Sequence, residues 1–274
     1  MKLALALLAF NWTFGCDGSA IATIDAQGSP TRLLTADPCV VEGAPRAAYP
    51  DVTADGRTIL FVRGTRLALM DADGSDVRVL PIATESEPAI APGGRQVAYT
   101  QVRRGRSWVW TARSDGSGRR RLRAGSEPDF SRNGRRIAYV SPTGAVVVIG
   151  LDGAVRQRIA TRAAAVDWAP TGPTMLMTTR GGRLRLISGG DVVPAPVETD
   201  RVVSAAWAPD GRGLAYVREL PADEEELRYG VYTVRFGSAP RRIYATDEER
   251  VEETLEPLTL TWGVRPPAAR AAGD

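Results

Sequence analysis

The chain has 274 residues, of which 43% are hydrophobic and 24% are charged, a composition typical of a globular protein with a large core. Its formal net charge is only +3, and arginine supplies nearly all of the positive charge because Lys2 is the only lysine. There is no histidine and there are only two cysteines, which excludes a Ser-His-Asp triad, a histidine metal site and a cysteine-rich zinc site. Any catalysis would have to use carboxylate, tyrosine or arginine side chains.

The N-terminus has the features of an export signal. Lys2 is followed by the apolar run Leu3–Phe10 and then by small residues. We therefore predict an export signal in residues 1–20 and a periplasmic or cell-surface location. The alternative is that Leu7–Phe14 forms a strand, in which case nothing is cleaved and the protein is cytoplasmic.

The two cysteines, Cys16 and Cys39, allow two further hypotheses. The apolar run is too short to remain as a membrane anchor, so the protein would associate with a membrane only if it were lipidated at Cys16. In an exported protein, Cys16 and Cys39 could instead form a disulfide.

One pattern then occurs five times: a hydrophobic residue, three further residues, a glycine and a short β-rich run. The five segments are Val52–Gly56, Ile90–Gly94, Phe130–Gly134, Trp168–Gly172 and Trp207–Gly211. Their glycines are 38, 40, 38 and 39 residues apart. Such a regular period of about forty residues indicates a repeat architecture.

Each repeat contains three further apolar segments separated by turns. The second segments are Ile59–Val62, Val97–Thr100, Ile137–Val140, Met175–Thr178 and Leu214–Val217. The third segments are Leu67–Met70, Trp108–Thr111, Val146–Ile149, Leu184–Ile187 and Val231–Val234, and a short polar-apolar strand such as Val77–Leu80 ends the unit. Four antiparallel strands every forty residues, joined by tight turns, predict the blade of a β-propeller.

The two ends of the chain match parts of a repeat. Ile21–Ile24 and Thr31–Leu34 match its second half, and Leu260–Trp262 matches its beginning. We therefore predict an all-β, six-bladed β-propeller of four-stranded antiparallel blades, whose sixth blade is closed by the N- and C-terminal segments. Five blades with loose ends is the alternative. The predicted domain covers residues 21–265, followed by a disordered tail at 266–274.

The segments Trp207–Tyr216 and Met70–Ser75 resemble the repeat of TolB-like (WD-repeat-like) propellers, and the resemblance extends over Gly18–Trp262. It implies a propeller that serves as a scaffold in the cell envelope, where the family docks with a peptidoglycan-associated lipoprotein, although similar blades also gate peptidases. TolB carries an additional α/β domain, so we expect the propeller part alone. The fourth repeat departs from the motif at Pro173 and at Gly189-Gly190.

Three glutamates occupy one repeat position, immediately before the innermost strand. They are Glu87, Glu127 and Glu256, and each is followed by proline. In a propeller this position lies at the mouth of the central channel, where binding sites collect. We predict a binding site here, either for a cation or for a basic segment of a partner. The alternative is that these are solvated loop residues beside a proline that stops edge pairing.

A second acidic segment, Asp71–Asp76, resembles part of a calcium loop because Asp71, Asp73 and Asp76 supply hard oxygen ligands. It lacks the later bidentate glutamate, and other repeats keep the turn without the carboxylates. A plain β-turn is therefore the better interpretation. We expect neither a metal nor another cofactor.

Charge is segregated along the chain. Residues 101–140 contain eleven arginines and three acidic residues, whereas residues 219–256 contain eleven acidic residues and five arginines. The acidic insertion Ala222–Leu227 lengthens one hairpin and is a candidate contact element. A protein-binding rim explains this distribution better than nucleic-acid binding, because the sequence lacks regularly spaced aromatic residues for base stacking.

The sequence thus predicts a non-catalytic, monomeric protein-binding scaffold, and not an enzyme or a nucleic-acid-binding protein. The alternative is a carboxylate-dependent glycoside hydrolase or lyase with its site at the central channel. That alternative requires two close carboxyl groups in the channel, one of them with a raised pKa.

Overall fold

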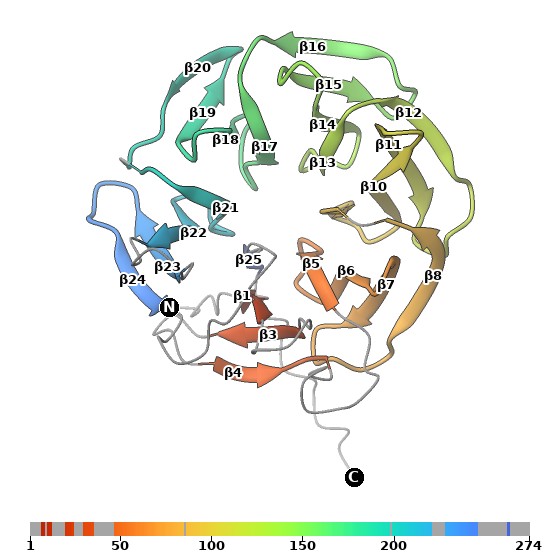
Figure 1. The fold of residues 1–274 in the computed structure, drawn as a ribbon, viewed down its shortest axis with the longest axis horizontal. Coiled ribbons are helices and arrows are strands. Elements are labelled where there is room, and N and C mark those ends of the chain that lie inside the picture. The colour runs from red at the N-terminus through yellow and green to blue at the C-terminus, as the bar shows by residue number, and fades with distance from the viewer. Residues whose placement is uncertain are drawn as a thin grey trace.

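Five four-stranded antiparallel sheets surround a common centre in the computed structural model (Figure 1). The structure describes residues 7–8, 10–12, 20–24, 30–35, 47–84, 86–197, 199–220, 228–245 and 262–263. The fold is therefore an all-β propeller with four-stranded antiparallel blades, as predicted. In the part of the chain that is described, no helix is long and apolar enough to cross a membrane.

We number the blades 1 to 5 in chain order, each from its innermost to its outermost strand. Blade 1 contains β5 (Ala47–Val52), β6 (Thr58–Arg63), β7 (Arg66–Asp71) and β8 (Arg78–Ala83). Blade 2 contains β9 (Ala89–Ile90), β10 (Gln96–Arg103), β11 (Arg106–Arg113) and β12 (Arg120–Ala124). Blade 3 contains β13 (Ser126–Phe130), β14 (Arg136–Val140), β15 (Val146–Gly150) and β16 (Val155–Ile159).

The remaining two blades follow the same order. Blade 4 contains β17 (Ala163–Trp168), β18 (Met175–Thr179), β19 (Leu184–Ser188) and β20 (Asp191–Pro194). Blade 5 contains β21 (Val202–Trp207), β22 (Gly213–Leu220), β23 (Arg228–Arg235) and β24 (Arg241–Ala245). Blade 4 keeps all four strands although its sequence departs most from the repeat.

The repeat glycine closes the turn between the two innermost strands of each blade. Gly56, for example, has a φ of 71°, and its N–H donates to the carbonyl oxygen of Thr53 at 2.8 Å. The other four repeat glycines have φ values between 65° and 75°. Since L-residues rarely adopt this left-handed conformation, the turn selects glycine once per blade.

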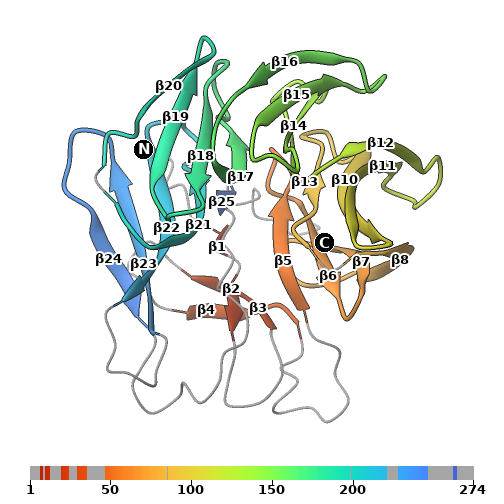
Figure 2. The ribbon, with the colours of Figure 1, turned by 45° about the horizontal axis from the view of Figure 1, so that its top comes forward.

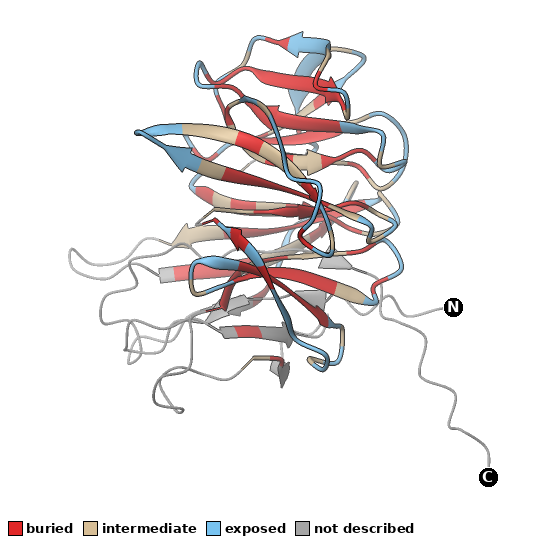
Figure 3. Cartoon of the chain, turned by 90° about the vertical axis from the view of Figure 1, so that its right-hand side faces the viewer, coloured by how far each residue is buried: buried red, intermediate tan, exposed pale blue. Residues whose placement is uncertain are grey.

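The core lies between neighbouring blades, in layers made by the two middle strands (Figure 3). Leu60 of β6 and Leu69 of β7 pack with Ile90 and Tyr99 of blade 2. Ile59 to Val62 are all buried, because a middle strand is covered on both faces by adjacent blades. The outermost strands are largely exposed, which accounts for their polar sequences.

The prediction of six four-stranded blades is wrong, because the described residues form five. The N-terminal segment forms a three-stranded sheet of β2 (Phe10–Trp12), β3 (Ala20–Ile24) and β4 (Pro30–Leu33). The C-terminal strand β25 (Trp262–Gly263) does not join this sheet and pairs instead with β1 (Leu7–Leu8). Strand β2 (Phe10–Trp12) pairs with the edge of β3 at which the C-terminal strand was predicted to pair. The two terminal segments therefore do not combine into one blade.

The three-stranded sheet packs against blade 1, where Ile21 is fully buried with Ile59 and Phe61. Strands β1 and β2 fall within the predicted export signal, residues 1–20, which stays a prediction. Four other predicted features lie outside the described residues: Cys16, Cys39, the insertion at Ala222–Leu227 and the tail at 266–274.

Candidate functional site in the central channel

The innermost strands bring five carboxyl groups together at the centre of the ring. Figure 2 shows β5, β13, β17 and β21 around this centre. Glu87 and Glu127, two of the predicted residues, line one cavity of about 100 Å³. The third, Glu256, lies outside the described residues. The same cavity is lined by three aspartates that the sequence analysis missed: Asp51, Asp129 and Asp167.

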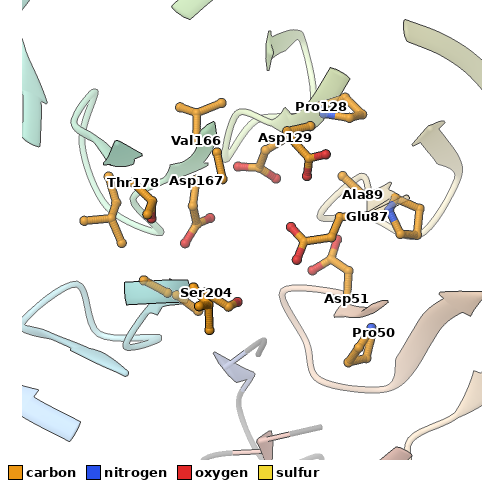
Figure 4. A pocket seen from close by; sticks show the side chains of 17 residues that line it. Pro50, Asp51, Glu87, Ala89, Pro128, Asp129, Val166, Asp167, Thr178 and Ser204 are labelled. Carbon is orange, nitrogen blue, oxygen red and sulfur yellow. The ribbon is translucent and has the colours of Figure 1, made fainter. Parts of the chain in front are cut away.

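The three aspartates occupy one repeat position, immediately before the hydrophobic residue of the motif. Their side chains point toward the centre of the ring, as does that of Glu87 (Figure 4). Blades 2 and 5 have Ala89 and Ala206 at this position. Aligning the repeats at the residue before the hydrophobic residue of the motif would have revealed the three aspartates.

Each aspartate joins its blade to the next one through a hydrogen bond, which we call an interblade clamp. In each clamp the carboxylate oxygen Oδ2 accepts from a backbone N–H of the following innermost strand. The clamps are Ile90 N to Asp51 at 2.7 Å, Trp168 N to Asp129 at 2.6 Å and Trp207 N to Asp167 at 3.1 Å. These bonds partly compensate the cost of placing carboxylates in the interior.

The junction between blades 2 and 3 has no such clamp, because Ala89 replaces the aspartate. At this junction the side chains of Glu87 from blade 2 and Glu127 from blade 3 hydrogen-bond to each other. Two carboxyl groups can share a hydrogen bond only if one of them holds a proton. The two carboxyl groups therefore meet at a junction that is also bridged by hydrogen bonds from Arg120 and Arg123 of blade 2 to backbone carbonyls of blade 3.

A β-bulge positions Glu127. The pairing of β13 with β14 shifts register between Ser126 and Asp129, and Glu127 has a φ of 52°. Tyr49 occupies the same repeat position in blade 1, within a similar bulge, and has a φ of 53°. Bulges re-aim side chains, and a non-glycine residue with positive φ indicates local strain.

The environment raises the pKa of the clustered carboxyl groups. Burial is the main cause at Glu127 and Asp129, whose pKa values lie well above the ordinary range, and the nearby charges of Glu87, Asp167 and Asp51 add to the effect. Burial also raises the pKa of Asp167 to about 7, and it raises that of Glu87. These side chains stay partly exposed, but only to the interior of the channel. The cluster therefore binds protons more readily than exposed carboxyl groups do.

The three aspartates line two cavities of the channel. A second cavity, of about 270 Å³, lies at the opposite ends of the innermost strands and is also lined by Asp51, Asp129 and Asp167. Arg132 lines this second cavity, whereas no basic side chain among the described residues lines the first. The mouth at Glu87 and Glu127 is therefore the acidic one.

The predicted alternative metal ligands lie in a turn away from the channel. Asp73 accepts hydrogen bonds from the backbone N–H of Ser75 at 2.9 Å and from its Oγ at 2.6 Å, as expected for a β-turn. Across the described ranges, no group of three or more Asp, Glu, Cys or His side chains is placed to hold a metal ion. Neither Asp71, Asp73 and Asp76 nor the described channel carboxylates form such a group.

Replacement of Asp129 by alanine is expected to destabilise the protein by about 1–3 kcal/mol at pH 5, because the N–H groups of Trp168 and Phe130 lose their acceptor. Urea unfolding measures this change. Asp115→Ala is the control, since Asp115 is exposed and accepts within its own turn, from Ser117. Equal stability of the two variants would show that the clamp contributes nothing.

The structure defines a β-propeller with an acidic central channel, and comparisons with known proteins agree on the fold. No protein-family model and no curated protein sequence matches the chain. Among solved structures, TolB from Acinetobacter baumannii has a TM-score of 0.67 at 13% identity, covering 94% of this chain and 66% of that one. A putative TolB from Agrobacterium tumefaciens has a TM-score of 0.63 at 16% identity, covering 78% and 84%.

A propeller in a nidogen/laminin complex is also similar, with a TM-score of 0.63 at 10% identity over 95% of this chain and 98% of that one. The predicted resemblance to TolB-like propellers is thus confirmed at the level of the fold. This chain spans 66% of the length of the Acinetobacter protein. Identities this low establish the fold alone.

Proposed function

We propose that this chain is an exported, non-catalytic propeller scaffold that binds a protein partner, and that its acidic channel mouth receives a basic segment of that partner. The observation that carries the proposal is the convergence of five carboxyl groups on a cavity that, within the described part of the chain, no lysine or arginine lines. A lysine or arginine from a partner would supply the missing positive charge.

The raised pKa values predict that the affinity for a cation depends on pH. A cation beside Glu87 and Glu127 favours their ionised forms and releases the proton that they share. Binding therefore becomes tighter as the pH rises from 5 to 8. A propeller of the same fold occurs in a complex of nidogen with laminin, which supports a protein partner in general. Location in the cell envelope rests on the predicted export signal and on the TolB-like fold.

The test uses a fluorescein-labelled peptide of alternating lysine and glycine and the intact chain. Glu87→Gln/Glu127→Gln should weaken binding by about tenfold or more, because it removes the charge-assisted hydrogen bonds while keeping side-chain size. The matched control, Asp115→Asn/Asp191→Asn, removes two exposed carboxylates elsewhere and should change the affinity by about twofold or less. Equal losses in both variants, or no binding at low salt, would contradict the proposal. Adding Glu256→Gln tests the third predicted residue.

A carboxylate-dependent hydrolase is a second candidate function, because Glu87 and Glu127 are paired and Glu127 has a raised pKa. However, the cavity of about 100 Å³ is smaller than the roughly 300–1,000 Å³ of most small-molecule sites. Asp129 and Asp167 already accept bonds from backbone N–H groups. Turnover of 4-nitrophenyl glycosides by the wild-type chain, lost in Glu127→Gln, would establish the enzyme. The scaffold proposal expects no turnover.

A further inference from the structure

The outer surface of blades 2 and 3 has a large excess of positive charge. Residues 101–162 contain fourteen exposed arginines, and thirteen remain when Arg132, which lines the second channel cavity, is set aside. Of the four acidic residues in this range, Glu127 and Asp129 line the channel, which leaves only Asp115 and Asp152 outside. Among the described residues, the one ion pair on this surface joins Arg156 to Asp152 at 2.9 Å. The surface therefore attracts anions over a wide area.

Within this surface lies a groove of about 540 Å³, between the turns of blades 2, 3 and 4. We call it the blade 2–4 groove and define it by five of its lining residues: Arg106, Ser107, Ser126, Ser141 and Arg180. Among the residues that the structure describes, no acidic one lines it. Arg106 and Arg180 are exposed, and within the described part of the chain neither guanidinium forms an ion pair. The groove thus offers two unneutralised guanidinium groups in a concave site.

The blade 2–4 groove and the acidic channel mouth open on the same face and are adjacent. Ser126 lines the groove, whereas Glu127, the next residue, lines the channel. In blade 4, Ala164 lines the groove and the next residue, Ala165, lines the channel. The face therefore has a negative centre with a positive flank across blades 2 to 4.

We propose that the blade 2–4 groove binds an acidic segment of a polypeptide partner. Aspartate or glutamate side chains of the segment would accept hydrogen bonds from the guanidinium groups of Arg106 and Arg180, a geometry that arginine favours. The hydroxyls of Ser107 and Ser126 can bond to the backbone of the segment, whereas that of Ser141 is buried and already bonds to Ala145 N–H and to Thr143. The volume is within the range of sites that bury a ligand, and the surrounding arginines suit an extended polyanion rather than a small ion.

A peptide fits this groove better than a nucleic acid. Single-stranded nucleic acids bind through successive aromatic side chains on which bases stack. Trp108 is the only described aromatic residue that lines the groove, and its ring is already covered by the guanidinium of Arg121, whose Cζ lies 4.5 Å from the ring centroid. The proposal does not depend on cation binding in the channel, because the two sites use different residues and take opposite charges.

The probe is a fluorescein-labelled twelve-residue peptide of alternating glutamate and serine, and the measurement is fluorescence anisotropy with the full chain. Arg106→Gln/Arg180→Gln should weaken binding by about tenfold or more. The matched control is Arg95→Gln/Arg135→Gln, which removes two exposed arginines from turns of the same two basic blades and should weaken binding by about twofold or less. Glu87→Gln/Glu127→Gln should leave this affinity unchanged, which separates the groove from the channel.

Three results would overturn the proposal. Equal losses in the two arginine variants would mean that the whole surface attracts anions without a defined groove. No binding at low salt would mean that the groove takes no acidic peptide. Tighter binding of a twelve-nucleotide single-stranded DNA under the same conditions, with the same dependence on Arg106 and Arg180, would make nucleic acid the ligand.

Discussion

Replacement of Gly125 by alanine is expected to destabilise the propeller by about 2–5 kcal/mol, through steric overlap and backbone strain together. Gly125 joins β12 of blade 2 to β13 of blade 3 and has a φ of 148°. A Cβ atom here would lie 2.5 Å from Cδ2 of Tyr139 and 2.5 Å from the carbonyl oxygen of Val140. Tyr139 is buried in the core between these blades and has little room to move.

Two control substitutions separate the contribution of steric overlap from that of backbone strain. Gly64 also has a positive φ, 60°, but a Cβ there meets no atom within 4 Å, so Gly64→Ala should cost about 1 kcal/mol. Gly93 has neither constraint, and Gly93→Ala should be close to neutral. Urea unfolding of the three variants gives the comparison. If Gly125→Ala loses no more than Gly64→Ala, the packing of Tyr139 is not rigid.

The free energy of unfolding is expected to fall as the pH rises from 5 to 8. The pKa of Asp167 is about 7 in the folded chain and near 3.8 when unperturbed, so in this interval the folded state binds more protons than the unfolded state. A group of this kind stabilises the fold fully below its unfolded pKa, and the contribution is lost as the pH rises through its folded pKa. Glu127 and Asp129 act in the same direction. The combined loss is on the order of a few kcal/mol.

Asp167→Asn isolates this effect, because the amide oxygen can still accept from Trp207 N–H while the charge is gone. The variant should be more stable than the wild type at pH 8 and should show a flatter pH dependence. Asp191→Asn, at an exposed position in β20, should keep the wild-type slope. Urea titrations at pH 5, 6, 7 and 8 measure both. An unchanged slope in Asp167→Asn would mean that Asp167 titrates normally.

Most of the fold could be predicted because each blade encodes it locally. The turn conformation of Gly56 and its equivalents requires glycine, and middle strands such as Ile59–Val62 must be apolar because neighbouring blades cover both faces. The number of blades could not be obtained in this way. A terminal segment that matches part of a repeat shows compatibility with a blade, but it does not determine which strand it pairs with. Strands β1 and β2 both lie in residues 1–20, whose composition is that of an export signal.

The candidate site was only partly predictable. Glu87 and Glu127 line the channel cavity because proline and the following apolar residues fix the start of the innermost strand, and their role in binding stays a prediction. Asp51, Asp129 and Asp167 were overlooked, although their shared repeat position was visible in the sequence. The contact between Glu87 and Glu127 depends on the bulge at Glu127, and a bulge leaves no distinctive mark in a single sequence.

The interblade clamps are not distributed evenly around the ring. Asp51 ties blade 1 to blade 2, and Asp129 and Asp167 tie blades 3, 4 and 5 in series. The junction between blades 2 and 3 is held further out instead, where the guanidinium groups of Arg120 and Arg123 donate to the carbonyl oxygens of Leu151, Asp152 and Gly153. Replacing these two arginines would therefore weaken a junction that no channel aspartate spans.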